Sequence, residues 1–346
     1  MYEDYYGLSG KPFQLNPDPA FFFGSRGHKR AFAYLQYGVH QSEGFIVITG
    51  EIGTGKTTLV RSLFENLDRN RLVAAQIVST QLDADDMLRS VAIAFGLPIK
   101  AVDKASLLAS LEAFLCQLAV ARKRALLVVD EAQNLTPRAI EELRMLSNFQ
   151  LGDQALMQSF LVGQPELRTM MQGPDMQQLR QRVIASYHLG PMDRGETQAY
   201  IEHRLTHVGW KGDPRFADDA LDRVHQASGG IPRRINTLCN RLLLAGYLGE
   251  KHSFAGADVD AIVREIREEL GPESVLQTLV SHPQPALEAV KGGGGPTAID
   301  TGVTAHLKQI DERLSSIERT LGSAIRLLQH LLEPDRVGKP RTPAGR

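Results

Sequence analysis

The feature that most constrains this chain is a glycine-rich loop that directly follows a short apolar run. Residues 45–49 read Phe-Ile-Val-Ile-Thr, and residues 50–57 read Gly-Glu-Ile-Gly-Thr-Gly-Lys-Thr. Glycines at this spacing allow a backbone that turns successive N–H groups toward a phosphate chain, at the N-terminus of the next helix. A chance glycine-rich turn would not explain both flanks, so the pattern predicts a nucleoside triphosphate site. Its expected contacts are Gly50, Glu51, Ile52, Gly53, Thr54, Gly55, Lys56, Thr57 and Thr58.

The second motif is a pair of acids at the end of another apolar run. Residues 125–131 read Ala-Leu-Leu-Val-Val-Asp-Glu. Ligands of open α/β sheets bind at the carboxyl ends of the strands, where these acids would lie. We expect Thr57 and Asp130 to hold Mg²⁺ beside ATP, Lys56 to contact the β and γ phosphates, and Glu131 to orient or deprotonate the attacking water. The alternative is that the acids cap the helix that begins near Thr136.

A glutamine follows a third apolar run, at residues 159–163. If that run forms a strand between the strand of the phosphate loop and the acidic strand, Gln164 stands between Lys56 and Glu131. It could then hydrogen-bond the γ-phosphate or the attacking water. The alternative is that Gln164 only begins a turn before Pro165.

Two pairs of arginines are candidates for contacts with the same phosphates. Arg233 and Arg234 open a helix that has Pro232 in its first turn. Neighbouring helical residues diverge by about 100°, so we expect one of them to reach the nucleotide, and we favour Arg233. Arg180 and Arg182 precede the last strand, where either could act as an arginine finger on the nucleotide of a neighbouring subunit. The alternative is a solvated pair at a helix end.

The order of apolar runs predicts an α/β fold with a parallel sheet covered by helices. The expected strands are 45–49, 73–79, 125–129, 159–163 and 186–189. Helical patterns follow at 196–208, 217–227, 232–248 and 259–270. We therefore expect an α/β core with the aromatic N-terminal segment at 1–190, a helical lid at 191–270, a flexible linker at 271–302, a coiled-coil helix at 303–333 and a basic disordered tail at 334–346.

The expected coiled coil is a source of self-association. Apolar residues recur there at alternating spacings of three and four, namely Leu307, Ile310, Leu314, Ile317, Leu321, Ala324, Leu328 and Leu331. This is the seam of a left-handed coiled coil, so we expect a homo-oligomer. The alternative is a single amphipathic helix docked on its own core. The tail beyond Pro334 could contact acidic lipid headgroups, RNA or nothing.

Composition excludes several other classes. The 346 residues are 42% hydrophobic, which is ample for a large core. No apolar stretch approaches the ~18 residues of a membrane span, and the first residues do not resemble a signal peptide. We expect a cytoplasmic protein, or one that is peripheral at the inner membrane. A net charge of −1 provides no general basic field, so nucleic acid is not favoured as a partner, although a local patch is not excluded.

The set of motifs resembles the AAA+ ATPases, and more narrowly those of general secretion pathway protein A (ExeA-like) and of exosortase (PEP-CTERM) loci. The blocks that carry the resemblance are 5–8, 11–13, 16–19, Ser25, His28, 50–58, 130–133, 163–167, 187–189 and 230–233. It implies that Gln164 takes the sensor-1 place, Arg182 the arginine-finger place and Arg233 the sensor-2 place, with the aromatic N-terminal segment near the base. Longer members of the secretion family carry a membrane span and a peptidoglycan-binding region, which this sequence does not show.

Three functional hypotheses remain open. The first is an ATPase that couples ATP turnover to the remodelling or assembly of a bacterial envelope system for secretion or polysaccharide export, acting on a protein partner. The second is a DNA-targeting ATPase of the transposition or replication-loading kind. The third is a nucleotide-gated scaffold that hydrolyses ATP only slowly.

Overall fold

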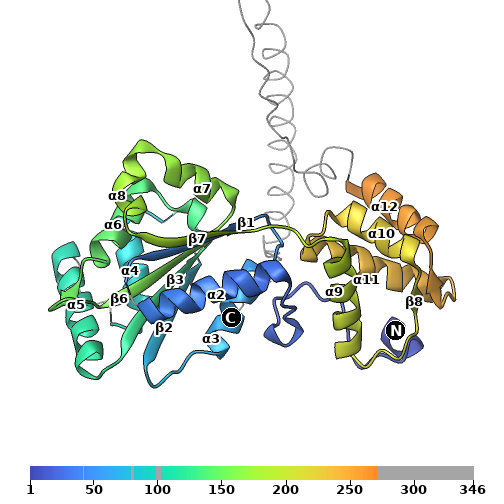
Figure 1. Cartoon of the computed structure of the whole chain (residues 1–346), viewed down its shortest axis with the longest axis horizontal. Coiled ribbons are helices and arrows are strands. Elements are labelled where there is room, and N and C mark those ends of the chain that lie inside the picture. The colour runs from blue at the N-terminus through green and yellow to red at the C-terminus, as the bar shows by residue number, and fades with distance from the viewer. Residues whose placement is uncertain (42, 79–81, 99–102, 271–346) are drawn as a thin grey trace, which may run out of the picture. The chain divides into compact units, whose positions relative to one another are not determined.

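The computed structural model describes residues 1–41, 43–78, 82–98 and 103–270 (Figure 1). These residues contain a five-stranded parallel sheet with the strand order β2-β3-β6-β1-β7. Its strands are β1 (Phe45–Gly50), β2 (Leu72–Val78), β3 (Arg124–Asp130), β6 (Met157–Gly163) and β7 (Val183–Leu189). The predicted parallel sheet is confirmed, and β6 lies between β1 and β3 as expected.

Helices cover both faces of this sheet, which explains why the inner strands β1 and β6 are buried along their whole length rather than at alternate residues. Alternate residues of β1 enter two separate clusters: Phe45 and Val47 pack in one, and Ile46 and Ile48 in the other. The second cluster is completed by α2 (Arg26–Gln41) and α3 (Lys56–Glu65). The first is completed by α4 (Ala84–Ala94), α5 (Lys104–Val120), α6 (Pro137–Leu146), α7 (Pro165–Gln172) and α8 (Gln177–Arg180).

A third cluster is built by the four helices that follow the sheet, α9 (Arg194–His207), α10 (Asp218–Ser228), α11 (Pro232–Leu248) and α12 (Gly256–Leu270). We call these four helices the lid. The first lid helix is started by a capping box in which Asp193 binds the N–H of Glu196 and Glu196 binds the N–H of Asp193.

The N-terminal segment differs from the expected domain division. We assigned it to the α/β core, but Tyr2, Tyr6, Leu8 and Phe13 are buried in the cluster of the lid helices. The helix α1 (Tyr2–Tyr5) packs on α11, where Gly246 leaves room for it: a Cβ at that glycine would lie 2.4 Å from the Tyr6 hydroxyl oxygen. The aromatic composition of the segment did not show in which of the hydrophobic clusters these rings would be buried.

Several short elements were not predicted. They are the strand pairs β4 (Gln150–Leu151) with β5 (Gln154–Ala155) and β8 (Arg215–Phe216) with β9 (Ser253–Phe254), and the 3₁₀ turns η1 (Pro19–Phe21), η2 (Ala132–Asn134) and η3 (Pro174–Met176). Elements of two or three residues are too short to show a periodic pattern.

Some predictions lie outside the described residues. They are the linker at 271–302, the coiled coil at 303–333, the basic tail at 334–346 and the last residue of the predicted strand 73–79. Of the helices in the described part of the chain, none has the length and apolar character needed to cross a membrane.

Candidate nucleotide site

The glycine-rich loop connects β1 directly to α3. Gly53 and Gly55 have φ angles of 84° and 95°, in the left-handed region that disfavours other residues. Gly55 is the N-cap of α3, and the Thr54 hydroxyl donates to the Glu51 carbonyl at 2.8 Å, which closes the loop. The N–H groups of the first helical turn are therefore available to an anion, as the sequence predicts.

Lys56 lies folded over this loop. Its Nζ donates to the carbonyl oxygens of Gly50 at 2.6 Å and Glu51 at 2.9 Å, and only 6% of the residue is exposed. Burial lowers the pKa of Lys56, while the carboxylates of Glu131 and Asp130 oppose that change. Phosphate oxygens are stronger, charged acceptors than these carbonyls, so a bound triphosphate can compete for the ammonium group.

Thr57 and Asp130 lie together at the end of the sheet. The Thr57 hydroxyl donates to Asp130 Oδ2 at 3.0 Å. Burial raises the pKa of Asp130, and the hydrogen bonds from Thr57 and from the Glu131 N–H oppose that shift. Both side chains offer hard oxygen ligands within reach of one ion, so the pair fits Mg²⁺. The capping alternative is wrong, because α6 is capped by Thr136, whose hydroxyl accepts from the Ala139 N–H at 3.1 Å.

Glu131 is held by two glutamine side chains. Its Oε2 accepts from Gln133 Nε2 at 2.6 Å and from Gln164 Nε2 at 3.1 Å. Burial disfavours the carboxylate, but the bonds from Gln133 and Gln164 and the charge of Lys56 outweigh it and lower the pKa of Glu131. The residue is therefore ionised at neutral pH.

Gln164 begins the helix α7 before Pro165, and its side chain lies beside Glu131. It is the N-cap residue of α7, but its side chain makes no capping hydrogen bond and binds Glu131 instead. Gln164 directly follows β6, and Glu131 directly follows β3. Because β6 lies next to β3 in the sheet, the two residues lie near each other.

A cleft of about 190 Å³ opens beside these groups. Its walls come from the phosphate loop, Glu131, the start of α11 and residues 14–18 and 21–23 of the N-terminal segment. The predicted residues that line it are Ile52, Gly53, Gly55, Lys56, Thr57, Thr58, Glu131 and Arg233. Residues 14–18 and 21–23 line the cleft that contains the phosphate loop. The position of this segment near the base, which the resemblance implied, stays a prediction.

The start of α11 packs directly on the phosphate loop. The Arg233 N–H donates to the Gly53 carbonyl at 3.1 Å, and Arg233 lines the cleft, whereas Arg234 is not among its lining residues. This arrangement favours Arg233 over Arg234 as the residue that reaches a nucleotide. A Cβ at position 53 would lie 2.5 Å from Arg233 Cβ, so only glycine allows the contact.

We expect Gly53→Ala to weaken binding of a non-hydrolysable ATP analogue by about tenfold or more, since a left-handed alanine is strained by ~1–2 kcal/mol and pushes α11 away. Isothermal titration calorimetry measures this affinity. Gly152→Ala is the matched control, because Gly152 has a φ of 66° and a Cβ there would meet none of the described residues within 4 Å. Equal affinities for wild type and Gly53→Ala would contradict the assigned contact.

The two candidate fingers lie away from this cleft. Arg180 Nη1 donates to the carbonyls of Met171 at 2.6 Å and Gly173 at 2.7 Å, and Arg182 Nη1 donates to the Ser147 hydroxyl at 2.9 Å. Both residues precede β7, whereas the phosphate loop lies at the carboxyl end of the neighbouring β1. Neither lines the cleft of its own chain. A contact with ATP from this position would have to be made to another subunit.

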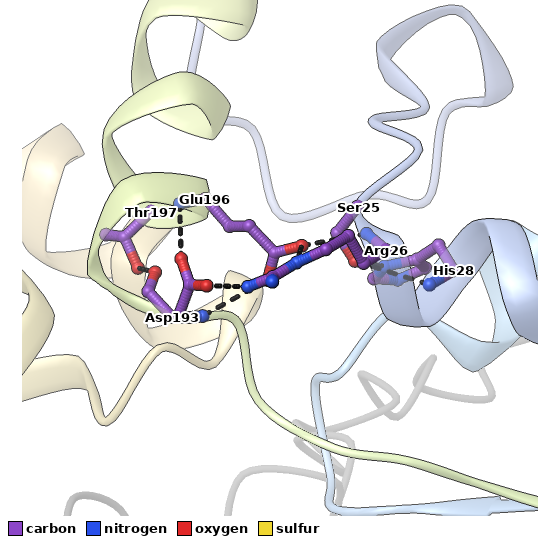
Figure 2. A network of polar contacts seen from close by, with 6 residues as sticks. All are labelled: Ser25, Arg26, His28, Asp193, Glu196 and Thr197. Atoms are coloured by element: carbon purple, nitrogen blue, oxygen red, sulfur yellow. Dashed lines mark hydrogen bonds and ion pairs between the residues drawn. The ribbon is translucent and has the colours of Figure 1, made fainter.

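His28 is a residue of the site to which the sequence assigned no role. It is 6% exposed and lines the cleft, and its Nε2 lies 2.9 Å from the Thr54 carbonyl oxygen, which can only accept a hydrogen bond. Nε2 is therefore the donor, and Nδ1 accepts from the Ser25 hydroxyl at 2.7 Å (Figure 2). Burial lowers the pKa of His28, in keeping with this neutral form. The spacing Ser-x-x-His at the start of a helix was the available signal.

The helix α2, which carries His28, also contacts the lid. Arg26 at the start of α2 binds both Asp193 and Glu196, the two residues of the capping box of α9 (Figure 2). Because the Arg26 side chain is 78% exposed, this ion pair contributes at most ~1 kcal/mol. It joins the helix that carries His28 to the first helix of the lid.

Arg204 is the other unpredicted residue of the site. This lid arginine is 6% exposed, and it donates to the carbonyls of Pro12 at 2.5 Å and Gln14 at 3.3 Å and to the Tyr200 hydroxyl at 2.7 Å. It thereby attaches the N-terminal wall of the cleft to α9. A lone arginine within a helical pattern gave no sign of this contact.

Comparison with known proteins agrees with this geometry. An AAA domain family matches residues 39–171. General secretion pathway protein A from Aeromonas hydrophila is 38% identical over 268 residues, which are 77% of this chain and 48% of that protein. The chain thus spans about half the length of this relative.

Solved structures share the fold at low sequence identity. Cdc6p from Pyrobaculum aerophilum matches with a TM-score of 0.55 and 16% identity, over 76% of this chain and 71% of that one. The ORC1 protein of Aeropyrum pernix in complex with DNA matches with a TM-score of 0.53 and 16% identity, over 75% and 70% of the two chains. At this identity the likeness describes the fold alone.

Proposed function

Because this chain is an AAA+ protein related to general secretion pathway protein A, we propose that it binds ATP with Mg²⁺ and hydrolyses it to ADP and phosphate. One observation carries the proposal: Lys56 of the phosphate loop and Glu131, kept ionised by two glutamine amides, line the same cleft. Phosphoryl transfer needs chiefly charge neutralisation and a positioned nucleophile, and these residues supply both.

Each residue has a separate part in the proposed reaction. The loop N–H groups and Lys56 bind the β and γ phosphates, and Arg233 approaches them from the lid. Thr57 and Asp130 would hold Mg²⁺, which would supply further neutralisation of phosphate charge. Glu131 orients the attacking water and accepts its proton, while Gln164 senses the γ-phosphate.

The cellular role we propose is remodelling or assembly of a bacterial envelope system for secretion or polysaccharide export. The named relative belongs to the general secretion pathway, and its 38% identity extends over 77% of this chain. We propose that the protein acts as a homo-oligomer, in the cytoplasm or at the inner membrane, on a protein partner. The lid contacts of Arg233 and Arg26 provide a route by which cleavage of ATP moves the lid.

A DNA-targeting ATPase of the transposition or replication-loading kind is the second candidate, because such ATPases share these nucleotide motifs. Turnover assays of the full chain separate the candidates. Stimulation by DNA with a steep salt dependence would favour the DNA-targeting function. Turnover without such stimulation favours the envelope function, and the absence of repeated turnover indicates a slow nucleotide-gated scaffold.

The partner can be sought with the Glu131→Gln variant, which we expect to keep ATP bound. Envelope fractions are passed over the immobilised variant in the presence of ATP or ADP. The experiment is done with the full chain and with a shortened chain that ends at Gly302. Capture of a secretion or export component only in the ATP state supports the envelope function. Capture of DNA instead, or no nucleotide-dependent capture, contradicts it.

Arg182→Ala is expected to lower turnover by about 10³-fold or more if the residue acts as a finger on a neighbouring subunit. Mixing this variant with Lys56→Ala should restore part of the phosphate release, because some sites then combine an intact phosphate loop with an intact finger. The same turnover measurement on Arg180→Ala shows whether Arg180 or Arg182 is the finger. No restored activity in oligomers that are shown to be mixed would contradict a site shared between subunits.

A further inference from the structure

The side chain of Gln133 joins the acidic strand to its neighbour β6 at the edge of the sheet. Its Nε2 donates to Glu131 Oε2 at 2.6 Å, and its Oε1 accepts from the backbone N–H of Gln164 at 2.9 Å. One amide therefore bridges the proposed base and the residue proposed to sense the γ-phosphate.

The chemistry of the partners determines the orientation of this amide. A backbone N–H can only donate, so the Gln133 atom that faces Gln164 N must be the oxygen. An ionised carboxylate can only accept, so the atom that faces Glu131 must be the nitrogen. Both contacts agree on one orientation, and reversing the amide would break both bonds at once.

Two amides meet on the same oxygen of Glu131. Gln133 and Gln164 both donate to Oε2, and neither of them occupies Oε1. Oε1 is then the oxygen that can take a proton from water. The bond from Gln133 is the shorter of the two, at 2.6 Å against 3.1 Å, so it is the stronger constraint on the carboxylate.

The backbone around Gln133 is built for this contact. Glu131 has a φ of 53°, which is uncommon for a residue with a side chain, and the turn η2 follows it at once. Opposite, Gly163 leaves the space that the amide fills: a Cβ there would lie 2.7 Å from Gln133 Oε1. Strand β6 thus approaches Gln133 closely only because residue 163 has no side chain.

We propose that Gln133 is a positioning residue that fixes the carboxylate of Glu131 relative to Gln164. Glu131 lines the nucleotide cleft, and both ends of the Gln133 amide are occupied by Glu131 and the Gln164 N–H, so Gln133 acts through Glu131 rather than on the phosphates. The inference rests on the proposed function, in which Glu131 activates water. The alternative role for Gln133 is only to satisfy the backbone N–H of Gln164.

Two substitutions separate these roles. Gln133→Glu keeps the length and the acceptor for the Gln164 N–H but removes the donor to Glu131. Gln133→Ala removes both bonds. Displacing a catalytic group by about 1 Å costs about 100-fold, so we expect kcat for ATP to fall by about 10- to 100-fold in both variants. The Kd of a non-hydrolysable ATP analogue should stay within about twofold of wild type, because the phosphate-binding groups are unchanged.

A charge-matched control is Gln172→Glu, at the exposed end of α7, which should keep wild-type kcat. A purely structural role predicts that Gln133→Glu retains kcat, or that kcat, Kd and melting temperature change together in Gln133→Ala; either result would overturn the inference. If wild type is active, Glu131→Gln is inactive and both Gln133 variants retain kcat, this inference alone fails. If wild type has no turnover, or Glu131→Gln turns over normally, the proposed function fails with it.

Discussion

Lys56→Ala is expected to reduce the affinity for MgATP by about 100-fold and to abolish measurable turnover. A hydrogen bond to a charged group contributes ~1.5–3 kcal/mol, and Lys56 is placed to make such bonds to more than one phosphate oxygen. Lys56 is already buried at the phosphate loop, and no other lysine of the described residues lines the cleft, so none of them is placed to take over its contacts.

Calorimetry with an ATP analogue and phosphate-release assays check this result. Lys211→Ala, an exposed lysine in the lid, is the control for loss of one positive charge, and it should leave both readouts unchanged. Lys56→Arg tests geometry, because a guanidinium keeps the charge but is a planar fork rather than a compact point charge. Unchanged affinity in Lys56→Ala would contradict the assigned site and with it the proposed function.

Glu131→Gln is expected to keep ATP bound while turnover falls by about 10²- to 10⁴-fold, the range of general base catalysis. The substitution preserves size, and the amide oxygen of the new side chain can still accept from Gln133 and Gln164. What is lost is the negative charge and the ability to take a proton. Binding should persist because Lys56, Thr57 and the loop N–H groups are unaffected.

Single-turnover measurements with labelled ATP separate binding from cleavage in this variant. Glu112→Gln, on the exposed side of α5, is the matched control and should turn over at the wild-type rate. Trapped ATP in Glu131→Gln supports the assigned base. A normal rate of cleavage would show that another group activates the water.

Local sequence patterns were sufficient for much of the fold and for the groups expected to contact phosphate. Gly53 and Gly55 need left-handed backbone, and the acids at 130 and 131 follow the apolar run 125–129. Each of these signals lies within a few residues, so it can be recognised without knowledge of the rest of the chain. The order of the motifs also predicted that β6 lies between β1 and β3, which places Gln164 beside Glu131.

Contacts between distant parts of the chain could not be found in this way. Arg204 binds the Pro12 carbonyl 192 positions earlier, and Tyr2 and Tyr6 pack in the lid cluster rather than against the sheet. Polar side chains such as Gln133 and His28 could equally have been solvated. Their partners are backbone groups or single side chains, which carry no periodic signature.

There is a physical reason why some features could be predicted from the sequence and others could not. A phosphate loop and a buried strand are specified by backbone dihedral freedom and by the burial of neighbouring residues, which are properties of short segments. Other features depend on which surfaces meet after folding. They are the orientation of Glu131, the cleft wall formed by residues 14–18 and 21–23, and the contact of Arg233 with Gly53. These contacts depend on packing between distant parts of the chain, so only the folded structure shows them.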